Sequence, residues 1–184
     1  FPSRSGGAKE SEPYRLYVAH ILRTEVDSIM NIRSHPQVII MGDFNDYPTN
    51  QSILKILKAE APPVKTNDLA STTDSANAST VTPSSLKLYH LLARKAKSKN
   101  FGSYKFRGEW GLLDHLIVSG TLLNQSNHFF TSEEKANVCL LPFLLKDDEK
   151  YGDKEPFRTY KGMKYQGGIS DHLPIYTDFE LILY

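Results

Sequence analysis

Apolar residues recur every three or four positions in the first part of the chain. This spacing places them on one face of a helix that we expect to begin at about Glu12. Pro13 is tolerated in a first helical turn, and Pro36 ends the pattern. The apolar positions on this face are Val18, Ile21, Leu22, Val26 and Ile29.

A continuous apolar run, Val38 to Met41, follows this helix and is bounded by a turn. Such a short run is typical of a strand that is covered on both faces. Asn50 is placed to cap a second helix that extends through Leu57. The order helix, strand, helix favours layered α/β architecture.

The middle of the chain alternates polar and apolar segments. Residues 65–85 are rich in Ser, Thr, Asn, Asp and Pro and are interpreted as a long surface loop. A basic helix is expected over 86–97, with His90 on its apolar face as a core histidine. Two strands are expected over 103–107 and 112–119, around a turn near residue 108.

The C-terminal third is predicted to consist of strands and turns. The charged stretch 146–154 is interpreted as a solvated turn. The last segment, LPIYTDFELILY, partly alternates polar and apolar residues, as strands do. No run of about eighteen apolar residues occurs, so we expect no transmembrane segment, and the sequence leaves the cellular compartment open.

Composition and charge narrow the class of partner. With 184 residues the chain fits one domain or part of a larger one, and 22 basic against 21 acidic residues give a net charge of +1. A protein held to long duplex DNA by phosphate contacts is usually more basic. Near-neutrality therefore favours a small or locally engaged substrate, although a basic patch can hide in the average. Cys139 is the only cysteine, which excludes an intrachain disulfide and a cysteine zinc site.

The first candidate chemical motif is GDFND, at the end of the apolar run that begins at Val38. Asp43 and Asn45 are two positions apart, so they share a side if strand geometry persists. A carboxylate there can bind a metal or orient water, and a carboxamide can donate to a phosphoryl oxygen. The alternative is a strand that leaves into an Asx turn, because Asp, Asn and Pro are turn formers.

The second motif is WGLLDHLIVSG, in which Asp114 interrupts an apolar strand. A carboxylate at such a position is costly unless it is paired or hydrogen-bonded, so we expect a histidine or a metal as its partner. The alternative is that Asp114 or His115 faces water on an exposed sheet face. His115 is interpreted as structural.

The third motif is GGISDHLPIY, where two glycines and Ser170 lead into Asp171 and His172. Adjacent Asp and His side chains can serve a hard cation and proton transfer respectively. Taken alone, this motif is first of all that of a loop capped by its own side chains. Three such motifs in one chain are harder to explain by turns alone.

Taken together and in this order, GDFND, WGLLDHLIVS and SDHLP resemble the endonuclease/exonuclease/phosphatase superfamily. The stretches FPSRSGG, GSYKFRGEW and EPFRTYKGMKYQGG are similar to a bacterial branch of it, so the resemblance covers most of the chain. It implies a metal-dependent phosphoesterase of the nuclease or phosphatase class. It also implies a four-layered α/β/β/α sandwich, with this chain supplying roughly the C-terminal half of a single domain over 1–184.

The resemblance also implies roles for individual residues. Asp43 would orient or deprotonate the attacking water, and Asn45 would hydrogen-bond the scissile phosphate. Asp114 would accept a hydrogen bond from His172, which would stabilise or protonate the phosphoryl centre. Asp171 would help to hold Mg²⁺ or Mn²⁺, which would neutralise charge on the phosphate.

Other polar residues have competing interpretations. Arg4, Arg158 and Tyr160 are candidate ligands for substrate phosphate, because arginine forks suit phosphate and tyrosines donate. Taken singly, each of them is better explained as a residue of a solvated loop. Tyr104 and Trp110 are interpreted as packing residues of the strands rather than as walls of a pocket.

The resemblance leaves one part of the family pattern without a counterpart. Family members carry a metal-binding Glu, with an Asn near it, in an earlier half, and the acids before Asp43 all read as helix surface. The domain is therefore expected to be N-terminally incomplete, with an apolar sheet face that pairs with an N-terminal half or a second copy. Two functions remain: a phosphoesterase acting on nucleic acid or a small phosphate ester, or a noncatalytic half-domain that serves as a binding module.

Overall fold

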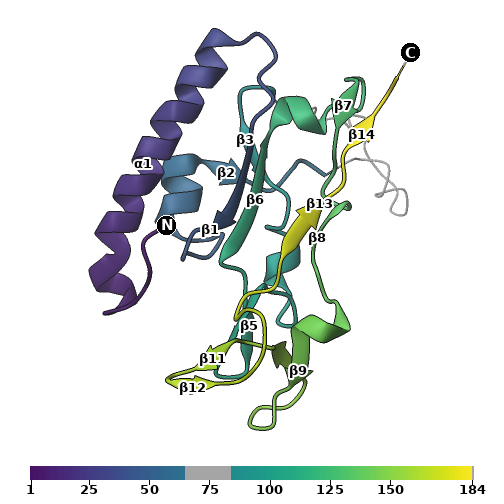
Figure 1. Cartoon of the computed structure of the whole chain (residues 1–184). Helices are drawn as coiled ribbons and strands as arrows, with labels where there is room; N and C mark the ends of the chain where they lie inside the picture. The colour runs from purple at the N-terminus through teal and green to yellow at the C-terminus, as the bar shows by residue number, and fades with distance from the viewer. Residues whose placement is uncertain (65–83, 184) are drawn as a thin grey trace, which may run out of the picture.

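The computed structural model describes residues 1–64 and 84–183. The predicted loop over 65–85 therefore lies almost wholly outside the described residues. Figure 1 shows the arrangement of the elements. In chain order they are α1 (Ala8–Ile32), β1 (Ile39–Asp43), η1 (Ser52–Leu57), β2 (Ala59–Glu60), β3 (Leu88–His90), η3 (Lys95–Lys97), β4 (Tyr104–Phe106), β5 (Glu109–Gly111), β6 (Asp114–Ser119), η4 (Gly120–Leu123), β7 (Phe129–Phe130), β8 (Ala136–Val138), η5 (Pro142–Leu144), β9 (Leu145–Asp147), β10 (Lys154–Pro156), β11 (Tyr160–Lys161), β12 (Lys164–Tyr165), β13 (Ile175–Thr177) and β14 (Glu180–Leu181).

A four-stranded sheet in the order β1-β6-β3-β2 forms the centre of the molecule. Only β2 and β3 run parallel, and the other two pairings are antiparallel. The long helix α1 and the short π-helix η1 lie over one face of this sheet (Figure 1). The remaining strands form five two-stranded ladders, of which β13-β8 lies beside β6.

The sheet separates two hydrophobic cores. Along β6, Ile117 points into the core under α1, whereas Leu116 and Val118 point into a second core on the opposite face. This alternation is what the two-residue period of a strand dictates. The second core is completed by residues of β8, η4 and the segment before β13, such as Leu173. The sheet is therefore covered on both faces along β6.

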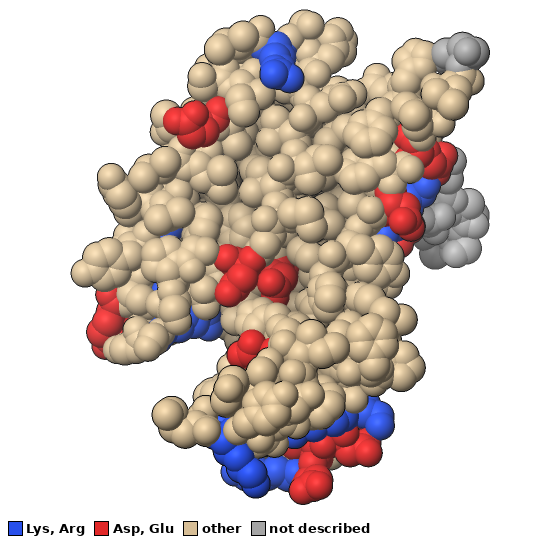
Figure 2. Space-filling model, viewed as in Figure 1, with Lys and Arg blue, Asp and Glu red and all other residues tan. Residues whose placement is uncertain are grey.

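The edge strand β1 is covered on one face only. Ile39 and Met41 share a face with Val118 and Leu116 in the antiparallel register, yet they are 45% and 57% exposed. The expectation that this strand is covered on both faces is therefore wrong, because the second core stops at β6. Figure 2 shows this face: most of its surface is uncharged, and a few acidic side chains gather near its centre.

The predicted basic helix over 86–97 is also wrong. Leu88–His90 forms β3, which joins β6 to β2, and only Lys95–Lys97 is helical, as a single 3-10 turn. Sheet hydrogen bonds on both sides of β3 override a helical spacing of leucines that is too short to stabilise a helix alone. His90 is fully buried, as expected, although it lies on a strand.

The two predicted helices exist but begin differently from the expectation. α1 begins at Ala8, so Pro13 lies inside it rather than in its first turn. The second helix is a π-helix without a side-chain cap, and the Asn50 side chain instead accepts a hydrogen bond from the Tyr47 backbone N–H. Asn50 thus closes the turn after GDFND, which an Asx residue does as readily as capping.

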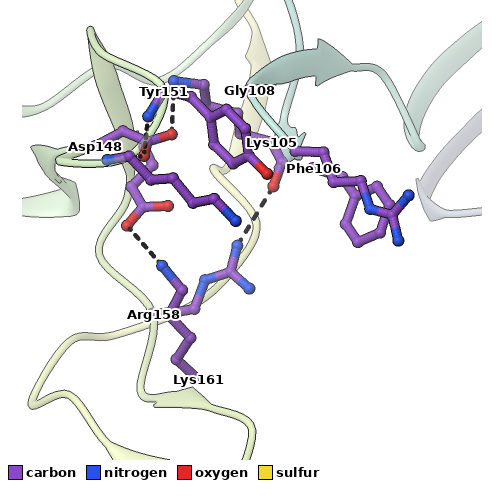
Figure 3. A pocket seen from close by; sticks show the side chains of 10 residues that line it. Lys105, Phe106, Gly108, Asp148, Tyr151, Arg158 and Lys161 are labelled. Atoms are coloured by element: carbon purple, nitrogen blue, oxygen red, sulfur yellow. Dashed lines mark hydrogen bonds and ion pairs between the residues drawn. The ribbon is translucent and has the colours of Figure 1, made fainter.

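Both strands expected around Gly108 are present. The first of the two expected strands is present as β4 and the second as β6, but the partner of β4 across the turn is β5, which was not expected, whereas β6 pairs with β1 and β3. The charged stretch 146–154 does turn between β9 and β10, but it is not wholly solvated. Asp148 is buried and forms an ion pair of 3.0 Å with the equally buried Lys105 (Figure 3).

The described residues thus form a mixed α/β fold with one larger sheet, several short ladders and few helices. They do not include a second extended sheet facing the first, so the four-layered sandwich stays a prediction. No helix among them is long and apolar enough to cross a membrane.

Candidate active site

The site begins where β1 and β6 end together. Asp43 is the last residue of β1 and Asp114 the first of β6, and they are paired directly in the antiparallel register. Paired residues project from the same face, so both carboxylates lie on the face where Met41 is exposed. The preceding Gly42 has a φ of 133°, a conformation open to glycine and strained for other residues.

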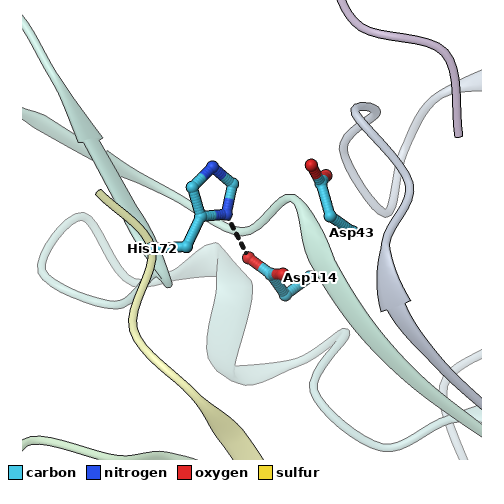
Figure 4. A group of neighbouring side chains, drawn as sticks. All are labelled: Asp43, Asp114 and His172. Carbon is cyan, nitrogen blue, oxygen red and sulfur yellow. Dashed lines mark hydrogen bonds and ion pairs between the residues drawn. The ribbon is translucent and has the colours of Figure 1, made fainter. Parts of the chain in front are cut away.

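The loop before β13 brings a histidine to these acids. The Leu173 backbone N–H donates to the Ser103 carbonyl at 2.7 Å, and Tyr104 forms a bridge with His172. His172 Nδ1 lies 2.6 Å from Asp114 Oδ2, and ligand atoms of the histidine and the two aspartates all lie within 4.8 Å of one another. Figure 4 shows the other ring nitrogen on the edge of the ring away from Asp114.

The charges around His172 favour its protonated form. Partial burial of the ring opposes a positive charge, but the hydrogen bond and the charge of Asp114, with smaller contributions from Asp43 and Asp171, outweigh it and raise the His172 pKa above 6.5. Because the carboxylate only accepts, Nδ1 must donate to it, which leaves Nε2 as the nitrogen available to a substrate.

Asp114 is itself oriented by a serine that the sequence analysis did not single out. The buried Ser103 donates from its hydroxyl to Asp114 Oδ2 at 2.5 Å. Ser103 and His172 therefore bind the same carboxylate oxygen, and among the described residues the other oxygen remains available. The result is a chain of hydrogen bonds, Ser103–Asp114–His172, that fixes the orientation of the imidazole.

Asp43 is held by the turn that follows it. Asn45 donates to both of its carboxylate oxygens, from the backbone N–H at 2.7 Å and from the side-chain amide at 3.0 Å. The same amide also donates to the Phe1 carbonyl, and Asn45 has a positive φ of 50°, which asparagine tolerates. The Asx turn and the candidate site are thus the same structure. In this arrangement the Asn45 amide binds protein atoms, and its contact with substrate phosphate stays a prediction.

A buried ion pair fixes the same turn from below. Asp46 is 1% exposed and lies 2.9 Å from Arg15 Nε, and it accepts a hydrogen bond of 2.6 Å from Ser52. Arg4 Nη2 lies 3.5 Å from Asp46 Oδ1, the oxygen that Arg15 also contacts, and Arg4 Nε donates to the Asn45 carbonyl at 2.6 Å. Helix α1, η1 and the N-terminal segment are therefore all fastened to GDFND.

Two buried histidines continue this network into the core. His90 Nδ1 accepts from the Leu92 backbone N–H, so its Nε2 carries the proton and donates to His115 Nδ1 at 2.5 Å. His115 Nε2 in turn donates to the Asp46 carbonyl at 2.8 Å. Burial lowers the pKa of His115 to about 4 and holds the pKa of His90 below its usual value, so both rings are neutral at pH 7.

The remaining predicted residues lie around the site rather than in the cluster. Asp171 is exposed beside His172 and lines a shallow hollow together with Arg158 and Tyr160. Arg4 contacts GDFND on the other side and stacks over the Tyr47 ring at 4.7 Å. Their roles toward substrate or metal stay predictions.

Sequence reasoning missed the supporting residues. Ser103 precedes a strand and Arg15 lies mid-helix, so neither has a local context that marks it. The sequence of GDFND gives no sign that Asp46 is buried, unlike Asp43 of the same motif. A signal existed for Arg15, because it lies at the helical spacing of the apolar face, four residues before Ala19, where a charge requires a buried partner.

The cluster suits a divalent cation on its donor chemistry. Asp43 is exposed, and Asp114 has one oxygen not engaged by Ser103 or His172. Carboxylate oxygens are the preferred protein ligands of Mg²⁺ and Mn²⁺. Two carboxylates do not complete a sixfold shell, so water, substrate or a further protein surface would supply the remaining ligands.

The comparisons with known proteins agree with this geometry. The sequence matches the endonuclease/exonuclease/phosphatase family over residues 1–73 and 65–181. The chain therefore belongs to the endonuclease/exonuclease/phosphatase family. No curated protein and no solved structure gives a significant match. Members of this family are generally hydrolases that act on phosphate esters with divalent metals.

Proposed function

We propose that this chain carries the catalytic residues of a Mg²⁺- or Mn²⁺-dependent hydrolase that cleaves a phosphodiester or phosphomonoester by attack of water. The observation that carries the proposal is the cluster of Asp43, Asp114 and His172, whose ligand atoms all lie within 4.8 Å. Membership of the endonuclease/exonuclease/phosphatase family supports the same reaction class.

Asp43, His172 and Asp114 have separate roles in the proposed hydrolysis. The Asp43 carboxylate, fixed by Asn45, orients the attacking water and accepts its proton. His172 donates from Nε2 to a phosphoryl oxygen, and its hydrogen bond to Asp114 maintains the charge that this requires. A bound Mg²⁺ or Mn²⁺ would neutralise charge on the phosphate, with Asp43 and Asp114 as its ligands and Asp171 close by.

A complementary protein surface would complete this site. Ile39 and Met41 are exposed on the face from which Asp43 and Asp114 project, and Tyr176 of β13 is 44% exposed. A partner protein that packed on this apolar face could also supply the metal ligands that the two carboxylates do not provide. The partner is an N-terminal half of the domain or a second copy of this chain.

The first experiment separates the enzyme from a noncatalytic half-domain. Hydrolysis of bis(p-nitrophenyl) phosphate and p-nitrophenyl phosphate is followed with Mg²⁺, Mn²⁺ or EDTA, and Mn²⁺ binding is measured by calorimetry on the same preparation. We expect metal-dependent turnover that EDTA abolishes, and binding that Asp43→Asn weakens. Mn²⁺ binding without turnover of either ester would favour the binding module.

The second experiment tests the covered face. Sedimentation velocity over a range of protein concentrations is compared for the natural chain and Met41→Glu. Association that the substitution abolishes would identify a second copy as the partner. A natural chain that remains monomeric throughout would exclude the second copy and leave the N-terminal half.

A further inference from the structure

A cavity of about 270 Å³ lies apart from the carboxylate cluster, between the β4-β5 hairpin, the β9-β10 hairpin and the segment after β10 (Figure 3). Its lining has a strong excess of positive charge. The basic residues are Lys105, Arg107, Lys150, Arg158 and Lys161, and the acidic ones are Asp148 and Glu155. This local patch is concealed by the net charge of +1 for the whole chain.

The two acids of the cavity already have partners. Asp148 is paired with Lys105 at 3.0 Å, and Glu155 lies 3.4 Å from Lys146 and 3.7 Å from Lys161. Arginine and lysine side chains over aromatic rings account for two more contacts, at Phe106 and Tyr151, but these rings carry no charge. Among the described residues, three cations of the lining therefore have no carboxylate partner: Arg107, Lys150 and Arg158.

Arg158, which lines this cavity, has an unused donor. Its Nε is buried and has no hydrogen-bond partner among the described residues, and Nη2 reaches only the Lys105 carbonyl, at 3.4 Å. A buried donor without an acceptor destabilises the folded protein. An anionic oxygen in the cavity would satisfy it, and a guanidinium fork matches a phosphate in particular.

The cavity is rigidly built. Lys105 Nζ also donates to the Gly152 carbonyl at 2.8 Å, and the Asp148 carboxylate accepts from the Lys150 and Tyr151 backbone N–H groups. Hydrogen bonds from Lys105 and these N–H groups overcome the effect of burial and lower the Asp148 pKa, so the acid stays ionised. The two hairpins approach each other closely at Gly108, where an added Cβ would lie only 2.9 Å from the Tyr151 Cβ.

The cavity is connected to the catalytic cluster through two elements. Lys105 follows Tyr104, whose ring centroid lies 4.9 Å from that of His172 and whose backbone forms a bridge with it. Arg158 lines both the cavity and the hollow that contains Asp171. A ligand that reaches from the cluster past Asp171 therefore meets Arg158 next.

We propose that this cavity binds a second phosphate group of the substrate, held by Arg158 together with Arg107 and Lys150, while another phosphate occupies the catalytic cluster. The part of this proposal that places another phosphate in the catalytic cluster rests on the proposed function. It identifies the substrate class as a molecule with at least two phosphate groups. Such a molecule is either a polynucleotide or a small metabolite with two phosphate esters.

Binding of inorganic pyrophosphate without divalent metal tests the cavity independently of catalysis. Calorimetry is performed on the natural chain, on the double variant Arg107→Glu/Lys150→Glu and on the exposed control Lys99→Glu. We expect binding that weakens at least tenfold in the double variant, changes little in the control and falls with added salt. A natural chain that does not bind pyrophosphate, or a double variant that binds it equally well, would overturn the proposal.

Because Arg107 and Lys150 are exposed, the double variant is expected to fold, and its circular dichroism spectrum checks this. Arg158→Lys provides a second test, since it keeps the charge but loses the fork. We expect it to weaken pyrophosphate binding as well. Equal binding by this variant would contradict the assignment of the orphan donor to the ligand.

A kinetic arm distinguishes the two sources of phosphate and isolates failure of the proposed function. With Mn²⁺, kcat/KM is measured for a short single-stranded oligonucleotide, a sugar bisphosphate and the matching sugar monophosphate. We expect kcat/KM for either the oligonucleotide or the sugar bisphosphate to exceed that for the sugar monophosphate at least tenfold. The double variant should lose that preference. A preference that the double variant retains would overturn the proposal, whereas absence of turnover beside intact pyrophosphate binding would contradict only the hydrolase.

Discussion

Two aspartate–histidine pairs lie within a few residues of each other and have opposite properties. Asp114 and His172 are partly exposed at the ends of strands, and their hydrogen bond raises the histidine pKa. Asp46 and His115 are buried under the same turn, and burial lowers the His115 pKa to about 4. The same residue types therefore provide, on one side of GDFND, a histidine whose protonated form is favoured and, on the other, a neutral buried histidine.

The difference arises from what each histidine contacts. His172 donates to a carboxylate, whose charge stabilises the imidazolium, whereas His115 donates to the Asp46 backbone carbonyl. The Asp46 carboxylate is instead neutralised by Arg15. At the open site a carboxylate charge therefore lies beside the histidine, whereas in the core the carboxylate pairs with Arg15 instead.

The largest expected effect is on catalysis. His172→Ala removes the group that donates to the phosphoryl oxygen, so we expect kcat with Mn²⁺ to fall about 10²–10⁴-fold. The free energy of unfolding should change little, because the ring is partly exposed. Steady-state kinetics and urea unfolding measure the two effects on one preparation. His20→Ala, at an exposed position on α1, is the matched control and should keep its activity.

The second effect is on stability. Asp46→Asn removes the charge that neutralises the buried Arg15 guanidinium, which should reduce the free energy of unfolding by about 3–5 kcal/mol. Urea unfolding measures it, with Asp27→Asn as the control, since that acid pairs with Arg23 on the surface and should cost less than about 1 kcal/mol. Equal losses in the two variants would contradict a structural role for the buried pair.

The third effect is a dependence on pH. Above pH 6.5 the buried histidines are neutral in both the folded and the unfolded chain, so their contribution is complete. As the pH falls from 6.5 toward 4, the unfolded chain binds protons that the folded chain excludes, and stability decreases by about 3 kcal/mol for His115 alone. Urea midpoints measured across this range should show the decrease.

His172 should act in the opposite direction. Its raised pKa contributes stability below pH 6.5 that is lost as the pH rises through the folded-state pKa. His115→Gln should therefore flatten the acid decrease, whereas His172→Ala should not flatten it. A decrease that is unchanged in His115→Gln would show that other groups cause it.

The smallest expected effect concerns Ser103. Ser103→Ala removes one hydrogen bond to Asp114 while His172 keeps its own, so we expect kcat to fall about tenfold, the equivalent of a hydrogen bond of 1–2 kcal/mol. The pH profile of kcat should also shift, because the Asp114 carboxylate then accepts one hydrogen bond fewer. Ser98→Ala, at an exposed position, is the control. A Ser103→Ala variant with the same kcat and the same pH profile as this control would contradict a positioning role for Ser103.

The fold was predictable where local pattern and tertiary contacts agree. The helix over Val18–Ile29 and the strand at Val38–Met41 are present, and Val26 and Val38 face a core as their local patterns predict, whereas Ile21 and Met41 are exposed. The strand at Leu88 was not predictable, since its state depends on pairing with β6, about thirty residues later. The exposed face of β1 also depends on where a distant core ends, which a local pattern does not contain.

The candidate site was predictable to a similar extent. Residues within motifs, such as Asp43, Asp114 and His172, meet in the structure as a metal-type cluster. Residues that support them from other elements, such as Ser103 and Arg15, carry no signal in their neighbours along the chain. The basic cavity is a similar case, because its cations come from three separate segments.

The sharpest test of this active site is the rate of Mn²⁺-dependent hydrolysis of bis(p-nitrophenyl) phosphate by Asp43→Asn and by Asp27→Asn, each relative to the natural chain. Both variants replace one exposed acid, and only one of these acids belongs to the cluster with His172. The account predicts loss of turnover in Asp43→Asn and full turnover in Asp27→Asn. Equal turnover in the two variants would contradict the assignment of the active site to this cluster.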